Sequence, residues 1–338
     1  MSDAWRTSLD LEGRPAVGVD WLPAAAVADT AAHRPWRAAV GPARIGNVVV
    51  GNTAPAAPAA PSTPAAPVHW PLALVVWNAR VGGGAMRAFW EQLSTGVPTV
   101  LLLQEVFAAG ASLPEPSGDA RWAARIADCS REEDRIDIVT FARETGLSLL
   151  YVPSMRNGNP LNDPPEDRGN AILANIPLTR LRAIELPFER QRRVAVAASA
   201  TVGDYTIDFC SVHLDNRAPW RRAWRSLGAA RHRQMEGLLG VFPAGDGAHA
   251  HVLGGDLNTW VGGRREGAYR LARQHFPLPE QPDSRPTHHF EIGGWLRHSD
   301  HLMFRFPSGW RGECHRVDDT FGSDHYPLVG SVGPITGD

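Results

Sequence analysis

The chain has 338 residues, which is enough for one large domain or two of ordinary size. Hydrophobic residues make up 43% and charged residues 21% of it, which is close to ordinary globular usage and excludes a fully disordered chain. The 34 basic and 36 acidic residues give a formal net charge of -2, which argues against a polybasic nucleic-acid binder but leaves a local basic groove open.

The N-terminus shows no targeting segment. Its first residues lack the basic stretch and apolar core of a secretory signal, and no apolar run of about 18 residues predicts a membrane span. We therefore expect a cytoplasmic protein. The three cysteines are too scattered in the sequence for a disulfide framework or a zinc knuckle; they are Cys129, Cys210 and Cys314.

A segment rich in Pro and Ala divides the chain. Residues 54–67 read APAAPAAPSTPAAP, a composition typical of an extended linker or a disordered segment. We predict an N-terminal segment of unknown role over residues 1–53, a linker over 54–69 and a catalytic domain over 70–338.

Beyond the linker, short apolar runs alternate with polar stretches that contain Gly and Pro. This pattern predicts strands over residues 72–78, 99–105, 170–175, 194–201, 205–213, 249–256, 301–306 and 326–332. It predicts helices over residues 85–93, 131–146, 220–240 and 265–276, the second of which ends at Gly146. Such a mixture predicts one large α/β or α+β domain with buried central strands.

Residues that can bind metal ions or protons stand at the ends of these predicted strands. They are Asn78, Glu105, His213, Asp256, Asn258, Asp300, Asp324 and His325. Strand ends on one side of a sheet cluster in space, and binding sites are commonly built there. Taken singly, Asp256 and Asn258 are equally typical of a turn, and His213 of a buried core histidine.

The residue types in this set indicate a particular chemistry. Four carboxylates that converge repel one another unless a divalent cation lies among them, and oxygen ligands suit Mg²⁺ or Mn²⁺ rather than zinc. His213 and His325 would supply hydrogen-bond donors for a phosphoryl group or a proton for a leaving group. The set therefore favours metal-assisted hydrolysis of a phosphate ester.

At these residues the sequence resembles the endonuclease/exonuclease/phosphatase superfamily. The matching segments, in chain order, are VVWNAR, LLQEV, RGNAIL, SVHLDN, GGDLNTW, RHSDHLMF and FGSDHYPLV. The resemblance spans residues from about 72 to 333 and implies a four-layer sandwich, in which two packed mixed β-sheets are flanked by helices. One departure is Ser299, where relatives commonly carry an apolar residue.

The resemblance also implies a role for each residue. Asn78, Glu105 and Asp324 are similar to the family's metal-binding residues, with Mg²⁺ as the expected cofactor and Mn²⁺ as a substitute. The remaining residues resemble its catalytic set: Asp256 orients or deprotonates the attacking water, Asn258 positions phosphate or water, His325 and His213 contact the phosphate, and Asp300 supports a catalytic histidine or the leaving group.

Three further residues are candidate substrate contacts. Asn170 resembles a structural or substrate-facing position of the family. Arg217 and Arg221 begin an Arg- and Trp-rich segment, which either contacts phosphates and bases or forms an amphipathic helix with its arginines in solvent. We expect His288, His289 and His298 to be surface residues.

The substrate is the least determined part of the prediction. The residues after the GGDLN segment and around Asp300 disfavour the inositol phosphatase and abasic-site endonuclease branches of the resemblance. We predict a nuclease-like phosphodiesterase, with a phosphatase or a phospholipase-type hydrolase of a small ester or lipid as one alternative and an inactive binding module as another. The expected partner is a phosphate ester, such as a nucleic acid, and we expect a monomer.

Overall fold

The computed structural model describes most of the chain outside the predicted linker. The described residues are 4–23, 31–48, 71–80, 84–93, 96–110, 112–114, 135–157, 165–216, 228–243, 250–259, 262–289 and 298–335. The linker predicted over 54–69 and the candidate contacts Arg217 and Arg221 lie outside them.

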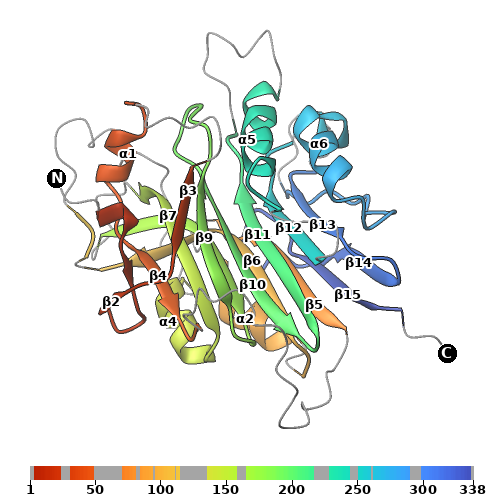
Figure 1. Ribbon diagram of the computed structural model, residues 1–338, viewed down its shortest axis with the longest axis horizontal. Helices are drawn as coiled ribbons and strands as arrows, with labels where there is room; N and C mark the ends of the chain where they lie inside the picture. Colours follow the sequence, from red (N-terminus) through yellow and green to blue (C-terminus); the bar gives the residue numbers. More distant parts are fainter. Residues whose placement is uncertain are drawn as a thin grey trace.

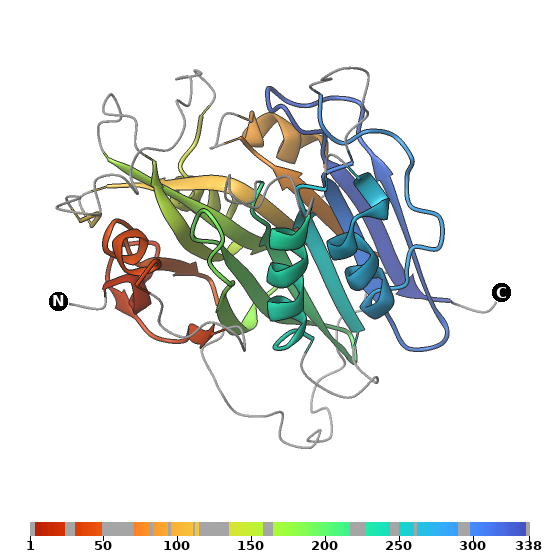
Figure 2. The ribbon, with the colours of Figure 1, turned by 90° about the horizontal axis from the view of Figure 1, so that it is seen from above.

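Two mixed β-sheets pack face to face (Figures 1 and 2). The larger sheet has the strand order β14-β15-β5-β6-β8-β7-β4-β1-β2. Its strands are β1 (Ser8–Leu9), β2 (Pro15–Ala16), β4 (Ala43–Gly46), β5 (Leu72–Asn78), β6 (Thr99–Ala109), β7 (Ser148–Asn157), β8 (Glu166–Ala174), β14 (Trp310–Arg316) and β15 (Leu328–Pro334).

The smaller sheet has the order β13-β12-β11-β10-β9-β3. Its strands are β3 (Asp20–Pro23), β9 (Thr179–Glu185), β10 (Val194–Val202), β11 (Tyr205–His213), β12 (Ala250–Asp256) and β13 (Asp300–Arg305). Each sheet contains both parallel and antiparallel neighbours, with β5 and β6 parallel in the larger sheet and β11 and β12 parallel in the smaller one.

Helices cover the outer faces of both sheets. The helices are α1 (Arg34–Ala38), α2 (Met86–Gln92), α4 (Ile138–Thr145), α5 (Ala229–Leu239) and α6 (Gly267–His275), with short 3₁₀ turns η1 (Ala4–Arg6) and η2 (Gly263–Arg265). Helices α2 and α4 pack on the larger sheet and α5 and α6 on the smaller one. The four-layer α/β sandwich predicted from the sequence is therefore confirmed.

The apolar runs of the sequence are explained by this layering, as β5 shows. Leu72, Leu74 and Val76 face the core between the two sheets, whereas Val75 and Trp77 face the layer of α2 and α4. Because side chains alternate between the two faces of a strand, a strand covered on both sides must be apolar throughout. All five side chains are fully buried. Burial of each one stabilises the folded state by on the order of 1.5–3 kcal/mol.

Helix α4 has the local signals that fix its ends. The Asp137 carboxylate accepts hydrogen bonds from the backbone N–H groups of Val139 and Thr140 and so caps the N-terminus. Gly146 ends the helix with φ of 69°, a left-handed conformation that glycine adopts without the steric cost of a side chain. The predicted end at Gly146 is thus confirmed.

The described part of the N-terminal segment contributes strands to both sheets. β3 pairs in parallel with β9 in the smaller sheet, and β4 pairs antiparallel with β7 in the larger one. In addition, Arg37 of α1 forms an ion pair with buried Glu185, which also binds fully buried Arg192. The division of the chain into an N-terminal segment and a catalytic domain stays a prediction, but the two share both sheets.

Asp167 provides a test of the contact between the N-terminal segment and β8. Its carboxylate accepts hydrogen bonds from the Tyr151 hydroxyl (2.6 Å) and the Gly41 backbone N–H (3.1 Å). Burial raises the pKa of Asp167 from the ordinary 3.8 to about 7, and these hydrogen bonds only partly oppose that rise. Since the unfolded chain releases this proton first, the free energy of unfolding should fall as pH rises from 3.8 to about 7.

We therefore expect Asp167→Asn to flatten this pH dependence and to raise stability relative to wild type at pH 8. Denaturant unfolding of both proteins at about pH 5 and 8 would measure it. Asp204→Asn, the same change at an exposed turn position, is the matched control. An equal pH dependence in wild type and Asp167→Asn would show that Asp167 is not held as a buried acid.

Among the described residues, no helix is both long enough and apolar enough to cross a membrane.

Candidate active site

The predicted site residues stand at one end of the two sheets. In the smaller sheet, strand pairing places His213 beside Asp256, and Asp256 beside Asp300, on three neighbouring strands. In the larger sheet, Asn78 at the end of β5 pairs with the residue before Glu105 in β6. Strand order and register thus bring together residues that lie far apart in the sequence.

Asp256 lies at the centre of this group and is 2% exposed. Its Oδ2 atom accepts a hydrogen bond from Asn78 Nδ2 (3.1 Å) and lies 3.5 Å from His213 Nε2 and 3.9 Å from His325 Nε2. Its Oδ1 atom accepts from the Asn258 backbone N–H (2.8 Å). Burial, with the nearby charge of Asp300, raises the pKa of Asp256 to about 7.

His325 and Asp300 form a buried dyad. His325 Nδ1 lies 2.7 Å from Asp300 Oδ2, and the Ser299 hydroxyl donates to the same oxygen (2.9 Å). Burial alone would lower the pKa of His325, but the Asp300 carboxylate outweighs it and raises that pKa to about 10. Burial would raise the pKa of Asp300, and the His325 charge in turn holds it below its usual value.

This dyad leaves the other ring nitrogen of His325 directed at the rest of the site. His325 Nε2 lies 3.9 Å from Asp256 Oδ2 and 3.9 Å from Asp324 Oδ1. A protonated ring therefore presents its Nε2–H group between two carboxylates, at the place where an anionic substrate oxygen would accept it.

Two of the predicted residues have a left-handed backbone conformation that is rare for a residue with a side chain. Glu105 has φ of 53° and stands where the β6–β8 ladder is interrupted, and Asn258 has φ of 51° with its amide donating to the Leu214 carbonyl (2.9 Å). Such conformations cost of order 1–3 kcal/mol and cluster at functional sites. Both therefore support a functional role for this end of the sheets.

Two arginines that the sequence analysis did not single out lie beside the acidic group. Arg168 Nη1 is 3.4 Å from Glu105 Oε2, and both Arg168 and Arg193 are buried. Glu105 Oε1 is in turn 3.9 Å from His213 Nδ1. Burial, together with the charges of Arg193 and Arg168, lowers the pKa of His213 well below its usual value, so this imidazole is neutral.

A sequence signal for these arginines exists. Arg193 directly precedes the predicted strand over residues 194–201, and Arg168 stands two residues before the one over 170–175. Both strands run antiparallel to a neighbour whose end carries a predicted site residue, so their first residues lie at the same edge of the sheet. Counting strand beginnings as well as strand ends would have found them.

His288 is a third residue whose place at the site the sequence analysis did not foresee. Its side chain is 15% exposed, its Nε2 atom is 3.7 Å from Asp324 Oδ2, and its ring centroid is 4.6 Å from that of His325. The expectation of a surface residue is wrong for His288, whereas His289 beside it is exposed. The backbone bridge between His288 and His325 brings the two rings together.

The remaining candidates are placed as follows. Asn170 is 2% exposed and its amide donates to the Val194 carbonyl (2.8 Å), which links β8 to β10 in the other sheet. A role for Asn170, Arg217 and Arg221 in substrate binding stays a prediction, and the two arginines lie outside the described residues.

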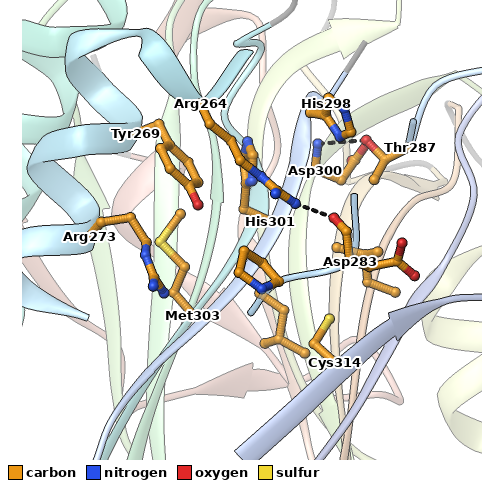
Figure 3. A pocket seen from close by; sticks show the side chains of 13 residues that line it. Arg264, Tyr269, Arg273, Asp283, Thr287, His298, Asp300, His301, Met303 and Cys314 are labelled. Carbon is orange, nitrogen blue, oxygen red and sulfur yellow. Dashed lines mark hydrogen bonds between the residues drawn. The ribbon is translucent and has the colours of Figure 1, made fainter. Parts of the chain in front are cut away.

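A small cavity next to the dyad has Asp300 in its lining (Figure 3). The Thr287 hydroxyl oxygen accepts a hydrogen bond from the Asp300 backbone N–H (3.0 Å), as the figure shows, and one from the Ser299 N–H (3.1 Å). Arg264, Tyr269 and His301 line its far side. These contacts fix the backbone of Asp300, so that the cavity wall serves to position the dyad.

The donor set fits a divalent metal ion. Donor atoms of Asp256, Asp300 and His325 lie within 4.8 Å of one another. The carboxylates of Glu105 and Asp324 are more accessible, with 20% and 39% of their side chains exposed. The four carboxylates outnumber the positive side chains that the structure places beside them, Arg168, Arg193 and protonated His325, and a cation would neutralise the remaining negative charge.

The chain belongs to the endonuclease/exonuclease/phosphatase family, whose model matches residues 75–338. Members of this family are hydrolases that act on phosphoesters and generally depend on a divalent metal ion. The resemblance seen in the sequence motifs is thereby confirmed. No curated protein matches the chain.

Solved structures with the same fold include three bacterial proteins. An endonuclease/exonuclease/phosphatase from Beutenbergia cavernae is 18% identical with a TM-score of 0.52, over 78% of this chain and 72% of that one. A protein of the same description from Bacteroides vulgatus is 10% identical with a TM-score of 0.51, over 79% and 100%. Sphingomyelinase C from Streptomyces griseocarneus is 15% identical with a TM-score of 0.50, over 78% and 99%.

Proposed function

We propose that this protein is a Mg²⁺-dependent phosphodiesterase of the nuclease-like kind, which cleaves a phosphodiester by attack of water. The observation that carries the proposal is the buried carboxylate of Asp256 between a neutral and a charged histidine, His213 and His325. A base and two different imidazoles around one point are what proton transfer to and from a phosphate ester requires.

Each of these residues has its own role in the proposed reaction. Asp256, whose pKa of about 7 suits a general base near neutrality, orients the water and accepts its proton. Asn258, whose backbone N–H binds the Asp256 carboxylate, lies next to that water and helps to position it. The His325 imidazolium, held by Asp300, donates its Nε2–H to the phosphate oxygen.

His213 and the two arginines also act on the substrate. His213 is neutral and offers one ring N–H to the phosphate or leaving group. Arg168 and Arg193 add positive charge that favours an anionic substrate over a neutral one. Asn78, Glu105 and Asp324 would hold Mg²⁺, with Mn²⁺ as a substitute, and a bound ion would neutralise charge that develops on the phosphate.

The alternatives differ in substrate and in activity. A lipid substrate is suggested by the likeness to a sphingomyelinase C, but only three large apolar side chains of the described residues are well exposed. Two of them, Tyr205 and Ile335, lie at the opposite ends of β11 and β15 from the site. Over the described part of the chain this disfavours a lipid surface, and the presence of every predicted catalytic residue disfavours an inactive binding module.

A substrate comparison tests the proposal. We expect Mg²⁺-dependent cleavage of bis(p-nitrophenyl) phosphate, DNA or RNA at rates at least about tenfold above those for p-nitrophenyl phosphate and sphingomyelin vesicles. Chelation should abolish the activity, and Mg²⁺ or Mn²⁺ should restore it. Faster hydrolysis of the monoester or of the vesicles would assign the chain to the phosphatase or phospholipase alternative, and no hydrolysis at all to a binding module.

A further inference from the structure

A second group of ligands shares Asp324 with the proposed Mg²⁺ site and otherwise differs from it in chemistry. His288, Asp324 and His325 each offer one donor atom, and these atoms lie within 4.8 Å of one another. His288 Nε2 is 3.7 Å from Asp324 Oδ2, and His325 Nε2 is 3.9 Å from Asp324 Oδ1. Two imidazole nitrogens and a carboxylate are typical ligands of zinc and other borderline transition metals, not of Mg²⁺.

We propose that His288, Asp324 and His325 form a binding site for a transition-metal ion such as Zn²⁺, with water or substrate completing its coordination. Zinc ligands at about 2.0–2.2 Å from the ion in a tetrahedral site lie about 3.3 Å apart. The separations of 3.7 Å (His288 Nε2 to Asp324 Oδ2) and 3.9 Å (His325 Nε2 to Asp324 Oδ1) are about 0.4 and 0.6 Å longer than this, so small side-chain rotations would bring the three residues to binding geometry.

His325 already has a carboxylate hydrogen-bonded to its second ring nitrogen, as histidines that bind zinc usually do. Its Nδ1 atom is hydrogen-bonded to the Asp300 carboxylate at 2.7 Å, which leaves Nε2 as the ligand atom. A carboxylate behind a metal-binding histidine fixes the ring orientation and strengthens the ligand. This partner distinguishes the group from a chance cluster of surface side chains.

The segment that carries His288 is held firmly in place. On one side the Thr287 hydroxyl accepts from the Asp300 N–H (3.0 Å), and the Thr287 carbonyl accepts from the Tyr326 N–H (2.8 Å). On the other side the His289 N–H donates to the Asp324 carbonyl (2.8 Å). The residues on both sides of His288 are therefore hydrogen-bonded to the segment that carries Asp324 and His325. The backbone of His288 is already in place, so binding of an ion would cost little conformational entropy.

Occupation of this site has a consequence that rests on the proposed function. An ion bound at His325 Nε2 takes the place of the proton that this ring would donate to the phosphate. We therefore expect Zn²⁺ to inhibit the Mg²⁺-supported reaction. The site itself can be tested without any reference to activity.

The test is metal binding to the full chain. Titration calorimetry with Zn²⁺ and the visible ligand-field absorption of added Co²⁺ should report a site whose affinity falls at least about tenfold in His288→Asn. His289→Asn, at the exposed neighbour, is the matched control and should bind like wild type. Equal Zn²⁺ affinity and an equal Co²⁺ spectrum in His288→Asn and wild type would overturn the proposal, provided both melt at the same temperature.

Measuring activity as well as binding separates the proposed metal site from the proposed function. If Zn²⁺ binding depends on His288 and Zn²⁺ inhibits wild type more than His288→Asn, both hold. If binding depends on His288 but Zn²⁺ does not inhibit, the metal site stands and the proposed role of His325 fails. Mg²⁺ affinity should be the same in wild type and His288→Asn, since an imidazole is a poor ligand for Mg²⁺.

Discussion

Asp256→Asn is expected to lower kcat/KM for a phosphodiester by about 10²–10⁴-fold, the range typical for loss of a general base. The carboxamide keeps the shape of the side chain but cannot accept a proton from water at neutral pH. Because the pKa of Asp256 is raised to about 7 by burial, the loss should be largest at and above that pH, where the wild-type carboxylate is ionised. Steady-state kinetics across pH 6–9 (about the range in which this group titrates) would measure it.

This variant should fold normally, which makes the kinetic result interpretable. Replacing Asp256 removes one hydrogen bond with Asn78 or Asn258, which costs about 1 kcal/mol. It also removes a buried charge that Asp300 disfavours, which offsets that loss. The melting temperature should therefore stay close to that of wild type. Asp204→Asn makes the same chemical change at an exposed turn and should leave the rate unchanged.

A folded Asp256→Asn protein with wild-type kcat/KM would remove the base from the mechanism. The site would then lack a residue that accepts the proton of the attacking water. Family membership alone would support hydrolysis.

The sequence pattern predicted the strands that are covered on both faces. The strands over residues 72–78 and 205–213 have the same bounds in the structure, and each apolar run ends at a polar residue, Asn78 or His213. β7 was missed because Pro153 interrupts its run, and the register of its pairing with β8 shifts there. β14 was missed because it has no continuous apolar run: exposed Arg311, Glu313 and His315 alternate with half-buried Gly312, Cys314 and Arg316.

The site was predictable where chemistry and strand ends coincide. Asp256, at the end of its strand, could be found from its neighbours in the sequence. Arg168 and Arg193 stand at strand beginnings, which a search limited to strand ends leaves out. His288 has no such signal, because only a backbone bridge to His325 brings it to the site. Tertiary pairing of this kind leaves no mark on local hydrophobic periodicity.

His325 and Asp300 are expected to act as one unit, and their variants should be strongly non-additive. His325→Gln removes the proposed donor and Asp300→Asn the group that keeps it charged, since the Asp300 carboxylate raises the pKa of His325 to about 10. Each change should lower kcat by about 10²–10⁴-fold. The double variant should be no more than about tenfold slower than the slower single variant.

The hydrogen bond of the dyad also has a spectroscopic signature of its own. A proton shared between His325 Nδ1 and Asp300 Oδ2 at 2.7 Å should give a low-field proton resonance, lost in both single variants. Ser299→Ala is the matched control, because it removes the hydroxyl that donates to the same Asp300 oxygen (2.9 Å) but keeps the carboxylate. That control should retain the resonance and lose activity by no more than about tenfold. Additive losses in the double variant would mean that Asp300 stabilises the fold around His325 instead of holding its charge.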